Sequence, residues 1–180
     1  MLQSKAVFQP ATCIESFEEP MTIRPAETRD HDPIWAILEP VIRAGETYTL
    51  PRDLGRDDAL AYWFKEGHEV LVAEENGTVV GTYYLRANQD GGGSHVANCG
   101  YMTAADATGR GIAGAMCVDS LERARRRGFR AMQFNFVVSS NERAVRLWQR
   151  FGFAILGTLP NAFLHPQFGY VDAHVMFRVL

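Results

Sequence analysis

The sequence predicts an α/β domain in which a mixed sheet is flanked by helices. Helix-like and strand-like patterns follow one another in the order β-α-α-β-β-β-α-β-α-β-β. Asn76-Gly77 separates two strand-like runs, and this dipeptide is a strong signal for a tight hairpin. The run at residues 131–138 is apolar at nearly every position, as expected for an internal strand that is buried on both faces.

The first half of the chain supplies strands and two helices. A short strand at residues 22–25 precedes a helix with apolar positions at helical spacing. Asp57 and Asp58 begin a second, shorter helix. Strands follow at residues 70–75 and 78–85. The apolar stripe of the first helix consists of Ile34, Leu38, Val41 and Ile42.

The second half places a strand at residues 95–103, followed by a helix that continues to about Arg127. The strand at residues 131–138 leads to a helix capped by Asn141, and Gly152 ends that helix. Residues 169–180 form a closing strand. The first of these helices is expected to bury Ala113, Cys117, Leu121 and Ala124.

Length and composition indicate one globular domain. The 180 residues can bury a full core, and we expect residues 21–180 to form the domain after an N-terminal extension at residues 1–20. The net charge of −3 argues against a general nucleic-acid binder, which normally shows a basic face. No apolar run is long enough for a membrane span.

The three cysteines, Cys13, Cys99 and Cys117, lack the spacing of metal ligands, so no metal site is expected. An odd number of cysteines fits reduced thiols and therefore a cytoplasmic protein. An activated Cys99 would allow a covalent mechanism, but an isolated cysteine in a strand is usually inert.

A turn rich in small residues opens the helix after residues 95–103. Bare backbone N–H groups at such a turn, together with the positive end of the helix dipole, can hold a phosphate. Three glycines and an alanine would let the phosphate approach closely, and an arginine could add a charge-assisted contact. The turn reads Thr108-Gly109-Arg110-Gly111-Ile112-Ala113-Gly114.

The same turn spells G-x-G-x-x-G, the fingerprint of dinucleotide-binding Rossmann folds. That fold needs an acidic residue at the end of the next strand to bind the ribose. The strand at residues 131–138 holds no carboxylate, and too little chain follows for a doubly wound domain. The Rossmann interpretation is therefore disfavoured.

A second motif follows the strand at residues 131–138, and with the glycine-rich turn it resembles motifs A and B of the GCN5-related N-acetyltransferase (GNAT) superfamily. The resemblance covers roughly residues 22–180. It implies a three-layer sandwich whose mixed, mostly antiparallel sheet is splayed at the cofactor site, and acetyl-CoA as the cosubstrate. The second motif reads Asn141-Glu142-Arg143-Ala144, then Leu147-Trp148 and Phe151-Gly152-Phe153.

The resemblance also implies roles for individual residues. Thr108 departs from the Gln or Arg usual at its position, and Trp148 stands where many members have the Tyr that protonates the departing thiolate. We therefore expect Asn141 to hydrogen-bond the CoA sulfur and the Tyr101 N–H to hold the thioester oxygen. The expected cofactor-binding residues are Tyr101, Met102, Thr103, Thr108, Gly109, Arg110, Gly111, Ile112, Ala113, Gly114 and Asn141.

Asn98 is a polar residue inside an otherwise apolar strand, and both a structural role and substrate recognition remain open for it. A narrower resemblance favours recognition. Ser94-His95-Val96-x-Asn98-x-Gly100, with Asn135-Phe136 before Asn141, resembles the yeast proline-analogue (azetidine-2-carboxylate) acetyltransferases. This resemblance implies a small amino or imino acid, bound by Asn98 and by the backbone at Asn135 and Phe136.

The expected function is transfer of an acetyl group from acetyl-CoA to the amine of a small molecule, by direct attack in a ternary complex. A non-catalytic acyl-CoA-binding regulatory module and an acetyltransferase acting on a protein or peptide amine are the alternatives. The expected partner is the small amine acceptor, with no nucleic acid and no membrane. A homodimer is left open.

Overall fold

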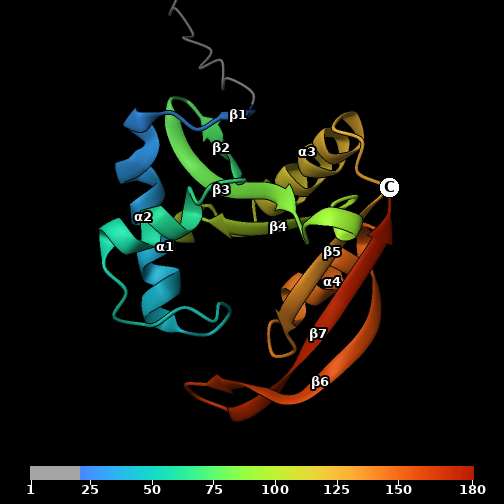
Figure 1. The fold of residues 1–180 in the computed structure, drawn as a ribbon. Coiled ribbons are helices and arrows are strands. Elements are labelled where there is room, and N and C mark those ends of the chain that lie inside the picture. The colour runs from blue at the N-terminus through green and yellow to red at the C-terminus, as the bar shows by residue number, and fades with distance from the viewer. Residues whose placement is uncertain (1–20) are drawn as a thin grey trace, which may run out of the picture.

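A computed structural model describes residues 21–180 of the chain. The N-terminal extension expected at residues 1–20, with Cys13, lies outside the described residues. Seven strands form one sheet in the order β1-β2-β3-β4-β5-β7-β6 (Figure 1). The strands are β1 (Thr22–Pro25), β2 (Glu69–Glu75), β3 (Thr78–Ala87), β4 (Val96–Thr103), β5 (Ala131–Val138), β6 (Ala154–His165) and β7 (Gly169–Val179).

Helices cover both faces of this sheet, which gives three layers (Figure 1). On one face lie α1 (His31–Ala44) and α2 (Arg56–Trp63), and on the other lie α3 (Ile112–Arg126) and α4 (Glu142–Arg150). The predicted fold class and order of elements are confirmed. Short 3₁₀ turns occur at Thr28–Asp30, Gly91–Gly93 and Ala105–Ala107. Within the described residues, no helix is long and apolar enough to cross a membrane.

Two apolar cores lie on the two faces of the sheet. One packs α1 and α2 against β2, β3 and β4, and the other packs α3 and α4 against the opposite face. Two predicted core positions need correction, because Val41 and Ala113 are only half-buried. Both of them line cavities that are described below.

The parallel pairing of β4 with β5 extends over only two residue pairs. All other neighbouring strands in the sheet are antiparallel. β4 and β5 pair only at Val96 with Ala131 and at Ala97 with Met132, and beyond these pairs the strands diverge. The splayed sheet that the sequence implied is therefore present, and the site is built around this splay.

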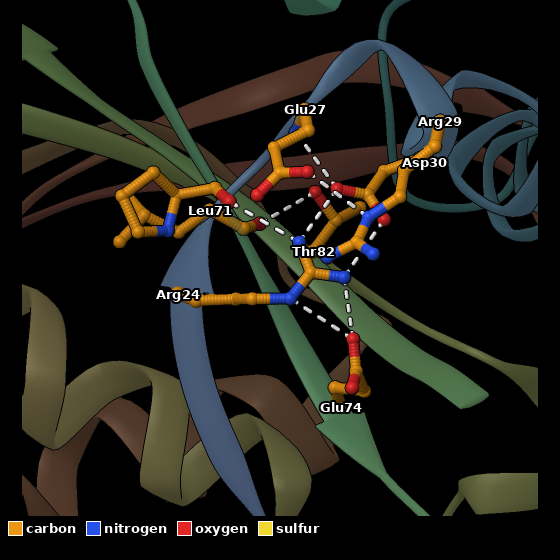
Figure 2. A network of polar contacts seen from close by, with 8 residues as sticks. Arg24, Glu27, Arg29, Asp30, Leu71, Glu74 and Thr82 are labelled. Atoms are coloured by element: carbon orange, nitrogen blue, oxygen red, sulfur yellow. Dashed lines mark hydrogen bonds and ion pairs between the residues drawn. The ribbon is translucent and has the colours of Figure 1, made fainter. Parts of the chain in front are cut away.

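Arg24 fastens the start of α1 to the sheet edge (Figure 2). Its Nη1 and Nη2 donate to the two carboxylate oxygens of Asp30 at 2.7 and 2.9 Å, and its Nε donates to Oε2 of Glu74 at 2.9 Å. Asp30, which is buried, also accepts from the Glu27 N–H at 2.7 Å. These bonds, the Arg24 guanidinium above all, hold the pKa of Asp30 below its usual value.

This ion pair makes a pH-dependent prediction. Asp30→Asn keeps an acceptor for the Glu27 N–H but removes the charge, so at pH 7 it should lower the free energy of unfolding by about 1–3 kcal/mol. Because the native pKa of Asp30 is depressed, its contribution is complete above the unfolded pKa of about 3.9. The contribution disappears as pH falls through the native pKa, so the two proteins should converge there.

Urea denaturation of both proteins across the acid range checks this expectation. Asp57→Asn is the control, because Asp57 is an exposed carboxylate that pairs with the half-exposed Arg56. A constant difference between wild type and Asp30→Asn at every pH would contradict the proposed role of the charge.

Candidate active site

The backbone of β4 offers unpaired groups to the splay. The Ala104 N–H donates to the Val80 carbonyl of β3 at 2.9 Å. Because backbone groups of a strand alternate between its two edges, the N–H and carbonyl of Tyr101 face away from β3, toward the diverged β5. The Tyr101 carbonyl accepts from the Tyr48 hydroxyl at 3.0 Å. Its N–H, the donor expected for the thioester oxygen, is thus directed into the splay.

Asn98 bridges the two strands at the point where they part. Its side chain is buried, and Nδ2 donates to the Gln133 carbonyl of β5 at 2.9 Å. This bond replaces a backbone bond that the divergence removes. Asn98 Oδ1 has no donor among residues 21–180, and Asn98 lines a cavity. The side chain therefore has a structural half and a half that is free to bind a ligand.

A first cavity of about 350 Å³ lies over the splay on the α1–α2 side. Its walls combine aromatic rings with amide side chains, and Arg86 is the one charged residue among the described residues that line it. Phe136 and Asn135 contribute from β5 at a register shift, where neither pairs with β7. Further lining residues include Val41, Tyr48, Tyr62, Tyr84 and Asn98.

A second cavity, of about 330 Å³, lies between the glycine-rich turn and α4. It shares wall residues with the first cavity, so the two spaces meet at the splay. The shared residues are Tyr101, Thr103, Asn141, Ala144 and Trp148. The structure therefore brings together, along one wall, most of the residues that the sequence assigned to the cofactor: Thr108, Gly109, Gly111, Ile112, Ala113 and Gly114.

The glycine-rich turn presents a set of unpaired amides. Gly109 and Gly111 have φ angles of +92° and +85°, which residues with a side chain rarely adopt. The first helical hydrogen bond of α3 runs from the Ala115 N–H to the Gly111 carbonyl at 3.0 Å. Within the described chain, no acceptor meets the N–H groups of Gly109, Gly111, Ile112, Ala113 and Gly114. Such an arrangement fits a pyrophosphate.

Two of the expected cofactor residues point elsewhere. Arg110 forms an ion pair with Glu75 of β2, so its charge is already matched, and it lines neither of the two cavities. Met102 is buried in the α1–α2 core and lines only the first cavity. Thr108 donates from its hydroxyl to the Ala104 carbonyl at 3.4 Å and remains at the second cavity.

Asn141 has one bonded and one free end. Its Oδ1 accepts from the Ala144 N–H at 3.2 Å and caps α4, as the sequence predicted. Its Nδ2 has no acceptor in the described part of the chain. Asn141 lines both cavities, so this free donor belongs to a residue at the junction of the two spaces. Beside it, Trp148 is buried, with its ring centroid 5.0 Å from Tyr101 and 5.1 Å from Phe134.

The cysteine and tyrosine side chains near the splay are held in their neutral forms. Burial raises the pKa of the Cys99 thiol to about 12, which makes a thiolate nucleophile unfavourable at neutral pH. Burial also raises the pKa values of Tyr48 and Tyr84 well above their usual range. These groups can donate hydrogen bonds but cannot serve as bases at neutral pH.

Sequence reasoning did not single out Arg86, and it gave Tyr48 no role. Arg86 pairs with Asn98 across β3 and β4, but that register depends on two strands whose ends the sequence does not mark. Asn135 is placed differently from a ligand-binding side chain. Its Nδ2 donates to Asn88 Oδ1 at 2.7 Å and its Oδ1 accepts from Gln133 Nε2 at 2.8 Å. Both polar ends of the Asn135 side chain are therefore already bonded, although Asn135 lines the first cavity.

A three-layer sandwich with a splayed sheet and a glycine-rich turn of unpaired amides at a helix start is typical of an acyltransferase fold, and comparison with known proteins agrees. Residues 34–153 match the model of the acetyltransferase (GNAT) family. The chain therefore belongs to this family, as expected from the two sequence motifs.

Individual relatives support the assignment. A GCN5-related N-acetyltransferase from Kribbella flavida is 42% identical, with a TM-score of 0.86 over 89% of this chain and 98% of that one. N-acetyltransferase aca1 of Schizosaccharomyces pombe is 28% identical over 74% of this chain and 72% of its own length. The Salmonella typhimurium protein yncA, solved with its cofactor acetyl-CoA, is 25% identical, with a TM-score of 0.78 over 89% and 94%.

The bridge from Asn98 leads to a stability prediction. Asn98→Ala leaves the partly buried Gln133 carbonyl without its donor, so the free energy of unfolding should fall by about 1–3 kcal/mol. Asn98→Asp keeps the size of the side chain but places a carboxylate next to the Gln133 carbonyl oxygen. The two oxygens repel each other, so the free energy of unfolding should fall further. Urea titrations of the three proteins measure this order. Equal stability of wild type and Asn98→Ala would show that the hydrogen bond from Asn98 to Gln133 does not stabilise the fold.

Proposed function

We propose that this GNAT acetyltransferase transfers the acetyl group of acetyl-CoA to the amine of a small amino or imino acid. The observation that carries the proposal is the meeting of two cavities at Tyr101 and Asn141, one lined by the unpaired amides of the turn and the other by side chains. A donor and an acceptor bound in these cavities would present their reactive ends to each other at the splay.

The cofactor cavity suits acetyl-CoA because its walls offer donors to an anion. The amides at Gly109, Gly111 and the start of α3 would hold the pyrophosphate. Acetyl-CoA supplies an activated thioester. The Tyr101 N–H would then be placed to donate to the thioester oxygen as negative charge develops there, and the free Nδ2 of Asn141 would be placed to donate to the departing sulfur.

Direct attack by the acceptor amine fits the titratable groups better than a covalent enzyme intermediate does. The Cys99 thiol is buried and has its pKa raised to about 12, so it would carry little thiolate at neutral pH. No carboxylate or imidazole among residues 21–180 lines the first cavity. The chain's contribution is therefore positioning, exclusion of competing contacts and stabilisation of developing charge.

A small acceptor is favoured by the first cavity. Its volume of about 350 Å³ is at the lower end of the range for small-molecule pockets. Asn98 Oδ1 offers an acceptor for an amine N–H, and the unpaired backbone at Asn135 and Phe136 offers further polar contacts. A protein or peptide amine and a non-catalytic acyl-CoA-binding role remain as the competing functions.

A panel assay separates these possibilities. Release of free CoA from acetyl-CoA would be followed with amino acids, imino acids, simple amines and peptides as acceptors. Acetyl transfer to amino or imino acids above the rate without acceptor supports the proposal. Turnover with peptides alone would favour a peptide acceptor. Tight binding of acetyl-CoA with no turnover for any amine would favour the regulatory role.

Charge at the turn should control cofactor affinity. Gly111 has open space where a Cβ would lie, so Gly111→Asp is sterically tolerated apart from its positive φ, but its carboxylate would repel the pyrophosphate. Gly111→Asn has the same shape without charge and accepts a positive φ more readily than most residues. Calorimetry should show much weaker acetyl-CoA binding by the Asp variant than by the Asn variant. Equal affinities would place the pyrophosphate elsewhere.

The free end of Asn141 should act on the rate. Asn141→Ala removes both the helix cap and the donor, whereas Asn141→Ser retains a capping hydroxyl. Removal of one oxyanion-type donor typically lowers kcat by about 10²–10³. Because the negative charge on a sulfur atom is diffuse and the Asn amide is neutral, the loss of kcat here should be about 10² or smaller. Both variants should therefore lose kcat with little change in either KM.

Thermal denaturation distinguishes the two roles of Asn141. The Ala variant should lose about 0.5–2 kcal/mol of stability, and the Ser variant should recover most of it. A Ser variant with wild-type kcat would limit Asn141 to capping α4.

A further inference from the structure

We infer that Arg86 is the carboxylate-binding residue of the acceptor cavity and selects acceptors that carry a free carboxylate. The inference rests on the proposed function, because it assigns a chemical requirement to the acceptor of that reaction. Arg86 is half-buried near the end of β3 and lines the first cavity.

The strand register places Arg86 beside the acceptor site. Arg86 lies directly opposite Asn98 in the antiparallel pair of β3 and β4. Residues opposite each other in such a pair project on the same face, and Tyr84, two residues earlier, projects there as well. Arg86, Asn98 and Tyr84 therefore share the face that looks into the first cavity, and all three line it.

The guanidinium of Arg86 has no carboxylate partner in the described part of the chain. Its one hydrogen bond runs from Nη1 to the neighbouring Ala87 carbonyl at 3.1 Å. Two other arginines that contact the sheet are matched by acids, Arg24 by Asp30 and Glu74, and Arg123 by Asp119. A half-buried guanidinium that faces a cavity without an acid leaves several donors for an anionic ligand.

The ligand chemistry follows from the shape of the two polar groups. A guanidinium binds a carboxylate through two parallel N–H donors. Asn98 Oδ1, next to it, accepts a hydrogen bond and therefore suits an amine N–H. In the register of β3 and β4, Arg86 lies opposite Asn98 and Tyr83 lies opposite Tyr101. A carboxylate held by the long Arg86 side chain would therefore lie on the Asn98 side of the cavity, with the amine directed toward Tyr101 at the splay.

The test compares acids with their neutral carboxamides. Proline, alanine and azetidine-2-carboxylic acid, each paired with its carboxamide, would be assayed for CoA release with wild type, Arg86→Met and Arg86→Lys. The wild type should prefer each acid by about tenfold to a hundredfold in kcat/KM. Arg86→Met should lose that preference through a higher KM for the acid. Arg86→Lys should keep part of the preference for the acid, since a lysine retains the positive charge but not the two parallel N–H donors of the guanidinium.

The design isolates the side chain from other effects. An acid and its carboxamide differ in amine basicity, but that difference is the same for every variant and cancels when their preferences are compared. Turnover of the carboxamide reports whether a variant is folded. Arg29→Met is the control, because Arg29 is 67% exposed and pairs only with Glu27 among the described residues.

The outcomes are distinct. A wild-type enzyme that acetylates acids and carboxamides equally well would overturn the role of Arg86, and so would an Arg86→Met variant that keeps the wild-type preference. The comparison of acids with carboxamides in the wild type requires no variant. If the wild type releases CoA with none of the pairs and no other amine, the proposed function itself fails, which is a separate result.

Discussion

The end of parallel pairing between β4 and β5 is the constraint on which the site depends. Two residue pairs hold these strands together, and beyond Ala97 their facing edges have no partner in one another. Unpaired backbone groups inside a protein are costly unless something satisfies them. Here Tyr48 and the Asn98 side chain satisfy some of the exposed groups, and the N–H of Tyr101 lies on the unpaired edge.

The splay also joins the two faces of the sheet. The first cavity lies on the face covered by α1 and α2, while the second is bounded by α3 and α4. A continuous sheet would separate these spaces. Because the strands diverge, the cavities share a wall, and two ligands that enter from opposite faces can meet there. Asn141 stands at this junction, where one end of its side chain holds a helix and the other faces both spaces.

The sequence predicted those parts of the structure that depend on local patterns. Periodicity and the Asn76-Gly77 turn were sufficient for the order of elements, and the closely spaced glycines were sufficient to locate a turn with unpaired amides, in which Gly109 and Gly111 have positive φ. Contacts between distant segments were not predictable. The pairing of Arg86 with Asn98 depends on a strand register, and the ion pair of Arg110 with Glu75 depends on how β2 approaches the turn.

The two cavities are lined by different kinds of chemical group. Unpaired backbone amides of the glycine-rich turn line part of the second cavity, whereas the first cavity presents side chains such as Arg86, Tyr62 and Asn98. A backbone donor survives most substitutions, but a side-chain contact changes with a single codon. Substitutions in the wall of the first cavity can therefore change what that cavity binds while the amides of the turn stay in place. A scaffold divided in this way can diversify its substrates without rebuilding its chemistry.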